Sequence, residues 1–351
     1  MTVSFDYDLI IIGSGPAGAT LARLVDSSIR TVIIDKKKET PGGFEKPCGG
    51  LLAPDAQRAL SRYDITLPKD VLVDPQIFSV KTIDLRSGLV RHYQRCYINM
   101  DRNKFDRWLC SMIPPHINRI EGLCLDITPM DIGYSIDYSR DGVHHSVTAK
   151  YIVGADGANS IVRNKLFPNK KLRRYTAIQQ WFVCGDQTPF YSCIFDPDTS
   201  DCCSWSISKD QYFIFGGAFP VQESRSRFEA QKKKLMDIGF PLEAPVKTEA
   251  CMVLRPRSFR DFCTGGGNAF LIGEAAGFIS PSSLEGISYA MESADMLSTA
   301  LNSSNPAAKY RRKTLKLRLK LAIKVLKCPF MYNPFLRRLV MKSGLQSIKV
   351  K

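Results

Sequence analysis

The sequence predicts an α/β fold in three parts: a Rossmann-type domain, an inserted antiparallel-sheet lobe and a basic helical tail. Three observations predict it. A buried-strand pattern at 7–12 runs into a glycine loop, a helix pattern at 17–25 and a second strand at 31–35, which is the order of a βαβ unit. Aromatic-rich, alternating strand patterns fill about 175–255. Residues 305–351 contain lysine and arginine but no aspartate or glutamate.

The composition restricts the class of protein. The chain has 351 residues, of which 44% are hydrophobic, so we expect a large buried core. Its 11 cysteines form no CxxC pair and no Cys/His cluster, which predicts reduced thiols in a cytoplasmic protein and no metal site. The N-terminus lacks the basic region of a secretory signal, and no apolar run reaches the roughly 18 residues of a transmembrane helix.

The order of the patterns gives provisional domain boundaries. We assign 1–70, 100–165 and 262–304 to the Rossmann-type domain and 71–99 with 166–261 to the sheet lobe. The tail, 305–351, carries 14 positive charges, so the remaining chain accounts for only one of the net +15. Further helices are predicted at 101–112, 224–236 and 287–301, and a buried strand at 269–272.

The first motif with a chemical meaning is the loop after the first strand. It has the GxGxxG spacing, in which the glycines allow a tight turn, close approach of a pyrophosphate and close packing of helix on strand. The phosphate charge then lies at a helix N-terminus. An acidic residue at the end of the second strand is placed to bind a ribose. The predicted cofactor contacts here are Gly13, Gly15, Pro16, Ala17, Gly18, Asp35 and Lys36.

Three later segments identify the dinucleotide. The run 154–163 (GADGANSIVR) resembles the GADGxxSxVR signature of the flavoprotein hydroxylase and geranylgeranyl reductase superfamily. The run 273–287 resembles its GDAAG…P…GI motif, with Glu274 in place of the usual aspartate, and the segment 102–109 (RNKFDRWL) resembles a third marker. The resemblance implies FAD. It also implies cofactor contacts at Arg102, Asp156, Gly273, Glu274, Gly286 and Ile287, with the last two at a helix N-terminus that faces the flavin.

The long loop after the second strand contains Cys48, Gly49 and Gly50, and resembles the PCGG element of the geranylgeranyl reductase branch, which lies near the flavin. Cys48 is therefore the candidate catalytic residue, as a thiol of lowered pKa or as a proton donor. The alternative is that it only packs against the flavin ring. Trp205 resembles the tryptophan of that branch's lipid-pocket motif, so it is a substrate-pocket candidate or, alternatively, a core residue of the sheet.

Nearly the whole chain is similar to the CbrA family of bacterial flavoproteins within this superfamily, notably at 46–57, 75–82, 190–195 and 270–289. The resemblance implies a FAD-dependent reductase of carbon–carbon double bonds in an isoprenoid or other lipid, with an apolar substrate channel in the sheet lobe. Two alternatives remain: a group A flavin monooxygenase, and a membrane-associated regulator that binds FAD and lipid without steady turnover. No second GxGxxG occurs, so the reductant is NAD(P)H bound transiently or another carrier.

The tail predicts a helix over 307–326, with a break at Cys328 and Pro329. Lysines and arginines surround an apolar stripe, which predicts binding to an anionic membrane surface on the inner face of the cell membrane. Alternatively, the stripe packs on the protein and the basic residues are solvated. Nucleic acid is not expected as a partner of a redox flavoprotein. The residues of the stripe are Leu315, Leu319, Ala322 and Leu326, with Ile323 beside it.

Overall fold

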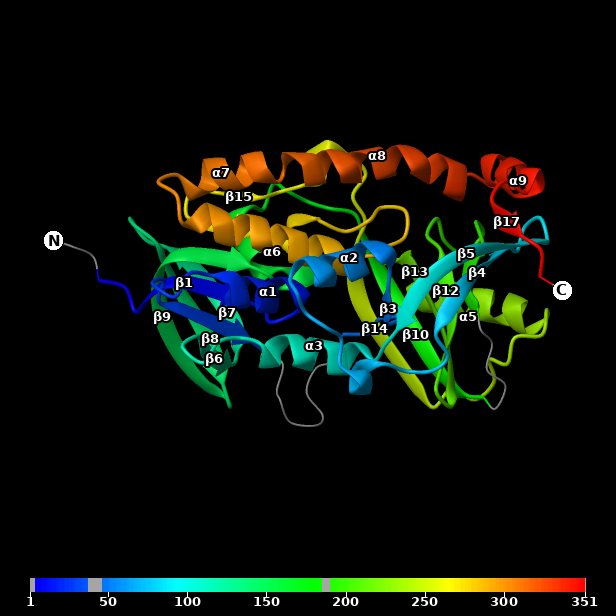
Figure 1. Ribbon diagram of the computed structural model, residues 1–351, viewed down its shortest axis with the longest axis horizontal. Coiled ribbons are helices and arrows are strands. Elements are labelled where there is room, and N and C mark those ends of the chain that lie inside the picture. The colour runs from blue at the N-terminus through cyan, green and yellow to red at the C-terminus, as the bar shows by residue number, and fades with distance from the viewer. Residues whose placement is uncertain (1–3, 37–45, 185–189, 351) are drawn as a thin grey trace.

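Two sheets lie side by side along the long axis of the molecule, and the C-terminal helices run across both (Figure 1). The computed structural model describes residues 4–36, 46–184 and 190–350. In this part of the chain, none of the helices combines the length and apolar character that crossing a bilayer requires. All eleven cysteines are free thiols.

The first sheet has the strand order β15-β16-β9-β1-β2-β6, and β8 and β7 extend it beyond β9. Strands β16, β9, β1, β2 and β6 are parallel. The predicted strands 7–12 and 31–35 are confirmed residue for residue, because both are short apolar runs that end at a glycine or a charge. The strands of this sheet are β1 (Tyr7–Ile12), β2 (Thr31–Asp35), β6 (Asn118–Glu121), β7 (Leu123–Pro129), β8 (Tyr134–Arg140), β9 (Val143–Gly154), β15 (Gly265–Gly266) and β16 (Ala269–Leu271).

Helices cover the first sheet, and the hydrophobic core lies on both of its faces. On one face Leu9 and Ile11 of β1 pack with Leu21, Phe105 and Leu297 from three different helices. The predicted helix 287–301 is confirmed, and the predicted helices at 17–25 and 101–112 are shifted or shortened by one residue at each end. The helices of this region are α1 (Pro16–Leu24), α2 (Pro54–Arg62), α3 (Arg102–Ser111), α4 (Ile161–Leu166) and α6 (Ile287–Leu301).

The second sheet has the order β14-β10-β13-β12-β11-β4-β5-β17. It was expected to be antiparallel, and most of it is, but β11 and β4 pair in parallel. A parallel pair requires a long connection, and the chain between these two strands provides it by passing through the first sheet. Helix α5 (Ser224–Met236) covers one face through Phe228 and Leu235. The strands are β4 (Ile77–Asp84), β5 (Leu89–Asn99), β10 (Arg174–Val183), β11 (Phe190–Phe195), β12 (Ser204–Lys209), β13 (Tyr212–Pro220), β14 (Lys247–Leu254) and β17 (Ser347–Ile348), with β3 (Leu51–Leu52) paired to β5.

The tail differs from the sequence prediction. It forms α7 (Pro306–Lys313), α8 (Leu315–Tyr332) and α9 (Pro334–Ser343), and Pro329 lies inside α8. The break falls at Thr314 instead, whose hydroxyl donates to the carbonyls of Tyr310 and Arg311 and so satisfies the end of α7. The predicted break at 328–329 is therefore wrong. Pro329 removes one backbone donor from α8, and the helix nevertheless continues to Tyr332.

Candidate functional site

The predicted cofactor motifs meet at one edge of the first sheet. Strands β1, β2, β9 and β16 are parallel, so their carboxyl ends share an edge. Gly13 follows β1, Asp35 ends β2, Asp156 follows β9 and Gly273 follows β16. In open α/β sheets, ligands bind outside this edge. The structure therefore brings together residues that are up to 260 positions apart in the chain.

The glycine loop has the shape that a pyrophosphate requires. Gly13 has φ = +101°, and a Cβ on Gly18 would stand 1.8 Å from the Gly13 carbonyl oxygen, so both positions are restricted to glycine by the protein itself. Gly15 is different: nothing lies within 4 Å of the Cβ it would carry. This open space lies at the N-terminus of α1, where the pyrophosphate of a dinucleotide would bind.

Asp35 lies at the end of β2 against the glycine loop. Its carboxylate accepts hydrogen bonds from the backbone N–H of Ser14 and from the Ser14 hydroxyl, the latter at 2.6 Å. Lys36 is exposed beside it. Asp35 thus fixes the loop in addition to its predicted role as a ribose ligand, and that role remains a prediction.

Asp156 supports the local backbone. Its Oδ2 accepts a hydrogen bond of 2.7 Å from the Ile161 N–H, in the first turn of α4. Burial raises the pKa of Asp156 to about 6. The Asp156 carboxylate therefore stabilises the turn that leads into α4, and a direct contact with FAD stays a prediction.

Glu274 links the two halves of the molecule. Its Oε1 accepts from the Leu254 N–H of β14 at 3.0 Å, and its Oε2 lies 2.6 Å from the ammonium of Lys46. Burial works against the charge of Lys46, but the carboxylate of Glu274 outweighs it and raises the lysine pKa. The longer side chain at this position therefore reaches across to the second sheet. Gly273 packs against Ala17, at the start of α1.

The predicted flavin-facing helix begins where expected. Helix α6 starts at Ile287, and the Gly286 carbonyl accepts its first hydrogen bond from Ala290 at 2.9 Å. Just before it, Glu285 accepts a hydrogen bond of 3.3 Å from the Tyr97 hydroxyl of β5, and burial raises the pKa of Glu285. The N-terminus of α6 therefore lies next to the second sheet.

Arg102 and Cys48 are brought together from α3 and the long loop. The Arg102 guanidinium pairs with Asp106 at 2.7 Å, one turn along α3. Burial alone would lower the pKa of Arg102, but Asp106 and Cys48 favour its charge, and the pKa is raised. A permanent positive charge therefore lies beside the cysteine, as expected for a group near the cofactor phosphates or flavin.

Trp205 lies directly behind this loop. A Cβ on Gly49 would stand 2.9 Å from Ile207 Cδ1 and 3.6 Å from Trp205 Cδ1, and the tryptophan ring also packs closely on Gly216. The indole N–H donates to Gln179 at 3.2 Å. Trp205 therefore forms the wall on which the loop rests, while contact with substrate remains a prediction.

Lys209 is a residue that the sequence did not indicate. It is 4% exposed, and its ammonium donates to the Gly50 carbonyl at 3.2 Å, the Met100 carbonyl at 2.7 Å and Asn99 Oδ1 at 2.6 Å. All three of its protons are used. Lys209 therefore fixes the Cys48–Gly50 loop to β12, the end of β5 and the start of α3. Its partners come from separate segments, so no local pattern marks it.

Lys209 gives a pH dependence with a definite sign. Burial lowers its pKa to about 8, whereas in the unfolded chain it titrates near 10.5. Between these values the unfolded chain holds the proton and the folded protein does not, so the free energy of unfolding rises with pH there, by at most about 3 kcal/mol. Urea unfolding at pH 8 and pH 10 measures this rise. In Lys209→Met the rise should disappear, and an equal rise in that variant would contradict the assignment.

A cavity of 260 Å³ opens between the long loop, α3 and the inner face of the second sheet. On the side of the second sheet, Glu249 accepts a hydrogen bond of 2.7 Å from the Trp181 indole and pairs with Lys247 at 2.7 Å. The lining is rich in charge, which differs from the apolar channel expected from sequence. The charged residues that line it are Lys46, Arg102, Arg107, Lys209, Lys247, Asp101, Asp210 and Glu249.

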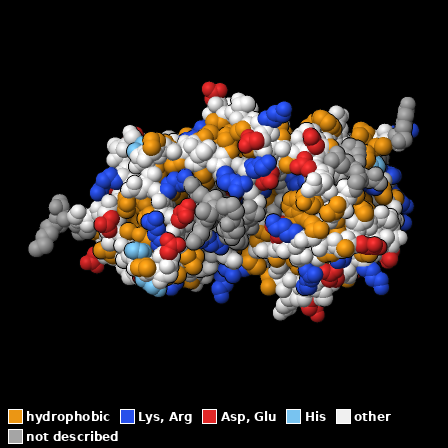
Figure 2. Space-filling view, turned by 90° about the horizontal axis from the view of Figure 1, so that it is seen from below, with side chains coloured by type: hydrophobic (Ala, Val, Ile, Leu, Met, Phe, Trp, Pro, Cys, Tyr) orange, Lys and Arg blue, Asp and Glu red, His pale blue; other side chains and the backbone are white. Residues whose placement is uncertain are grey.

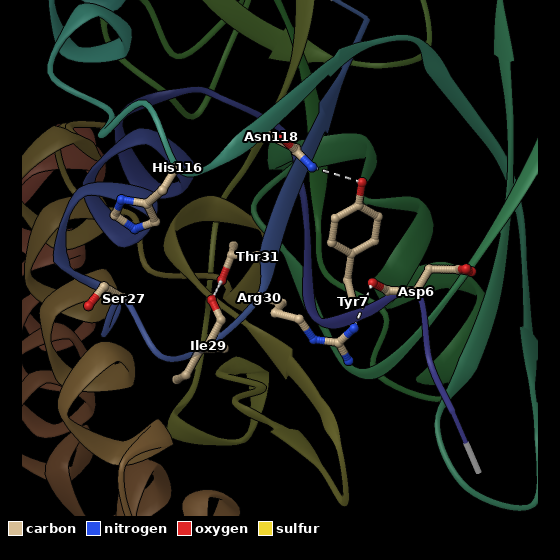
Figure 3. Close-up of a pocket in the computed structure, with 8 residues that line it drawn as sticks. All are labelled: Asp6, Tyr7, Ser27, Ile29, Arg30, Thr31, His116 and Asn118. Carbon is tan, nitrogen blue, oxygen red and sulfur yellow. Dashed lines mark hydrogen bonds between the residues drawn. The ribbon is translucent and has the colours of Figure 1, made fainter.

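A second cavity, of 510 Å³, lies at the other end of the first sheet (Figure 3). It is formed by the start of β1 at Tyr7, the start of β2 at Thr31 and the chain around His116 and Asn118. These are the amino ends of the parallel strands. The glycine loop and the other predicted cofactor residues lie at the opposite edge, so this cavity is not the cofactor site.

The fold and the site define an FAD-dependent oxidoreductase of the Rossmann type, with FAD as its cofactor. A family model described as an FAD binding domain matches residues 132–305. Among solved structures, a geranylgeranyl bacteriochlorophyll reductase-like protein from Thermoplasma acidophilum has a TM-score of 0.78 at 15% identity, over 92% of this chain and 85% of that chain. HpxO of Klebsiella pneumoniae, in a variant complexed with FAD, has a TM-score of 0.69 at 15% identity, over 96% and 94%.

Curated relatives identify the family. Protein CbrA of Escherichia coli O6:H1 is 50% identical over 97% of this chain and 94% of its own length. Protein CbrA of Shigella sonnei is also 50% identical, over 97% and 98%. The chain belongs to the CbrA family, as its sequence motifs predicted.

Proposed function

We propose that this protein uses FAD to reduce carbon–carbon double bonds in an isoprenoid or similar lipid that carries a polar head group. The observation that carries the proposal is the seating of the Cys48–Gly50 loop on Trp205 and Ile207, fixed by Lys209. This places the loop expected beside the flavin against a wall of the second sheet. The geranylgeranyl reductase-like neighbour supports a reductase, although a probable FAD-dependent monooxygenase from Pseudomonas aeruginosa, with a TM-score of 0.69, shares the fold.

The two ends of the site suit the two ends of such a substrate. Beside the loop, the wall presents the half-buried indole of Trp205, while Ile207 is buried beneath the loop. Beyond it, the cavity presents five basic and three acidic side chains. A hydrocarbon chain fits beside the indole. A polar head group fits the charged cavity, where Lys46, Arg102 and Lys247 are held in place by carboxylate partners. FAD, when reduced, supplies the hydride, and the protein residues orient the double bond and exclude water.

The reductant is a separate part of the proposal. The chain has no second GxGxxG motif, so we infer that NAD(P)H binds transiently or that another carrier reduces the flavin.

Anaerobic turnover tests the reaction. The flavoprotein is reduced chemically, mixed without oxygen with a polyprenyl diphosphate or a polyprenyl phospholipid, and the product is analysed by mass spectrometry. We expect reoxidation of the flavin and a gain of two hydrogens for each double bond reduced. The same incubation with an aromatic acid serves as the control.

Two outcomes would contradict the reductase. Incorporation of ¹⁸O from ¹⁸O₂ into an aromatic product would indicate a monooxygenase. Absence of turnover on every polyprenyl compound, with FAD bound and reducible, would favour the regulator that binds FAD and lipid without chemistry.

A further inference from the structure

Helix α8 presents a row of large apolar side chains to the outside. The row consists of residues spaced three or four apart, so they share one face of the helix. Their exposed fractions are far above those of core residues. They are Leu315 at 44%, Leu319 at 49%, Ile323 at 56%, Leu326 at 72% and Phe330 at 56%, and are called here the α8 stripe.

The opposite face of α8 is the one that packs on the protein. Leu317 is 2% exposed and Leu321 is fully buried, and both belong to the core beneath the first sheet. Arg318 donates to the Arg311 carbonyl at 2.7 Å on the same side. The helix is therefore already docked without using the α8 stripe. The alternative that the stripe packs on the protein does not fit this arrangement.

The exposed charges that α8 itself places beside the α8 stripe are basic, while Asp55 of α2 pairs with Lys320 at 3.3 Å and Lys324 at 4.0 Å, farther round the helix. Lys316 and Lys327 are exposed and lie beside the α8 stripe by helical spacing, and the tail holds no acidic residue. The face of the molecule seen in Figure 2, from the side opposite to α8 in Figure 1, differs, because basic and acidic side chains are mixed there. A partner that covers α8 must therefore provide an apolar region that buries the α8 stripe and negative charges that pair with the lysines beside it.

We propose that α8 lies flat on the surface of an anionic lipid bilayer, with the α8 stripe inserted among the acyl chains and the flanking lysines at the head groups. An exposed apolar face with lysines at its border is the pattern of interfacial helices. Basic residues are attracted to the negative surface potential of anionic lipids. A second protein chain would have to supply a matching acidic rim, and two copies of this chain facing each other through α8 would instead bring their exposed lysines together.

The placement also connects the membrane with the candidate site, and this step rests on the proposed function. Beneath α8, the Tyr332 hydroxyl donates to the Ser282 carbonyl at 2.5 Å, and the Cys328 thiol donates to the Pro281 carbonyl at 3.5 Å. The segment they hold leads directly into Gly286 and the start of α6. The bilayer would thus lie about one helix diameter, roughly 10 Å, from the segment next to the flavin, which suits a lipid substrate.

Vesicle co-sedimentation of the FAD-loaded full chain tests the proposal, using phosphatidylcholine alone and with phosphatidylglycerol. We expect binding to the anionic vesicles only. Leu319→Glu/Leu326→Glu should weaken it by at least about a hundredfold, because two apolar anchors are lost. Lys316→Gln/Lys327→Gln should weaken it about 25-fold, about fivefold for each charge. The matched control, Ile238→Glu/Val246→Glu, changes two apolar residues of similar exposure near the second sheet and should bind like the wild type.

Several results would overturn the proposal. They are failure of the wild type to bind anionic vesicles, equal loss in the control, or a dimer in light scattering that only the Leu319→Glu/Leu326→Glu variant dissociates. Flavin absorbance verifies that each variant still holds FAD. Because no turnover is measured, binding can fail while reduction of a detergent-solubilised lipid succeeds, and the reverse, so the two proposals are tested separately.

Discussion

Gly15→Val is expected to fold normally and to lose its FAD. Gly15 has φ = −65° and ψ = −173°, an extended conformation that valine adopts without strain. Its Cβ would point into open space, so the side chain meets no protein atom within 4 Å of that position. That space is where the pyrophosphate approaches the N-terminus of α1. The added methyl groups occupy the cofactor's place, and we expect FAD affinity to fall at least about a hundredfold.

The measurement is the molar ratio of FAD to protein after purification, together with circular dichroism and the unfolding temperature. Gly266→Val is the matched control, since Gly266 is exposed, has no positive φ and lies in the same sheet away from the loop. It should retain FAD. A Gly15→Val protein that purifies with one FAD per chain would show that the pyrophosphate binds elsewhere. Substitution of Gly18 is less informative, because its Cβ would collide with the loop itself.

Arg337→Met is expected to destabilise the whole protein by about 3–5 kcal/mol. Arg337 of α9 is 4% exposed and pairs at 2.9 Å with Asp84 of β4, which is 1% exposed. The same guanidinium donates to the Met331 carbonyl at 2.9 Å and lies 4.8 Å from the centre of the Phe195 ring. It therefore joins the tail to the second sheet. Its removal leaves the Asp84 carboxylate buried without a counter-charge.

Urea unfolding gives the free energies of unfolding. The neighbouring Arg338 is exposed on the same helix, so Arg338→Met should stay within about 0.5 kcal/mol of the wild type. Adding Asp84→Asn to Arg337→Met should recover part of the loss, because the unpaired charge is then absent. Equal effects of the two arginine substitutions would mean that the buried pair does not hold the tail.

Much of the first sheet could be predicted because its signals are local. The strands 7–12 and 31–35 are continuous apolar runs, and the glycine spacing from Gly13 to Gly18 dictates the turn between them. The motifs at Asp156 and Gly273 follow strands, so a parallel sheet brings them to one edge. The helices 224–236 and 287–301 are long, and both were predicted with the correct bounds.

Long-range pairing could not be predicted. The partners of Lys209 lie at Gly50, Asn99 and Met100, and those of Glu274 at Lys46 and Leu254, so each contact depends on the packing of the two sheets. For the same reason the sequence did not indicate the charged cavity around Glu249. Only the fold places these side chains together.

The tail shows the limit of periodicity. Helical spacing identified an apolar stripe on 315–326, but α8 also carries Leu317 and Leu321 on its other face. Both faces are apolar enough to be buried. In the structure, Leu317 and Leu321 pack into the core next to the first sheet, so the opposite face of the helix, with the α8 stripe, is exposed.

An experimental structure of the protein as isolated, with its own cofactor, tests the central claim most directly. We predict that the FAD pyrophosphate lies over Gly15 at the start of α1. We also predict that the flavin ring lies between the Cys48–Gly50 loop and the N-terminus of α6, with any lipid against Trp205. FAD bound in the cavity beside Tyr7 and Asn118, or a flavin ring remote from the Cys48–Gly50 loop, would contradict the account.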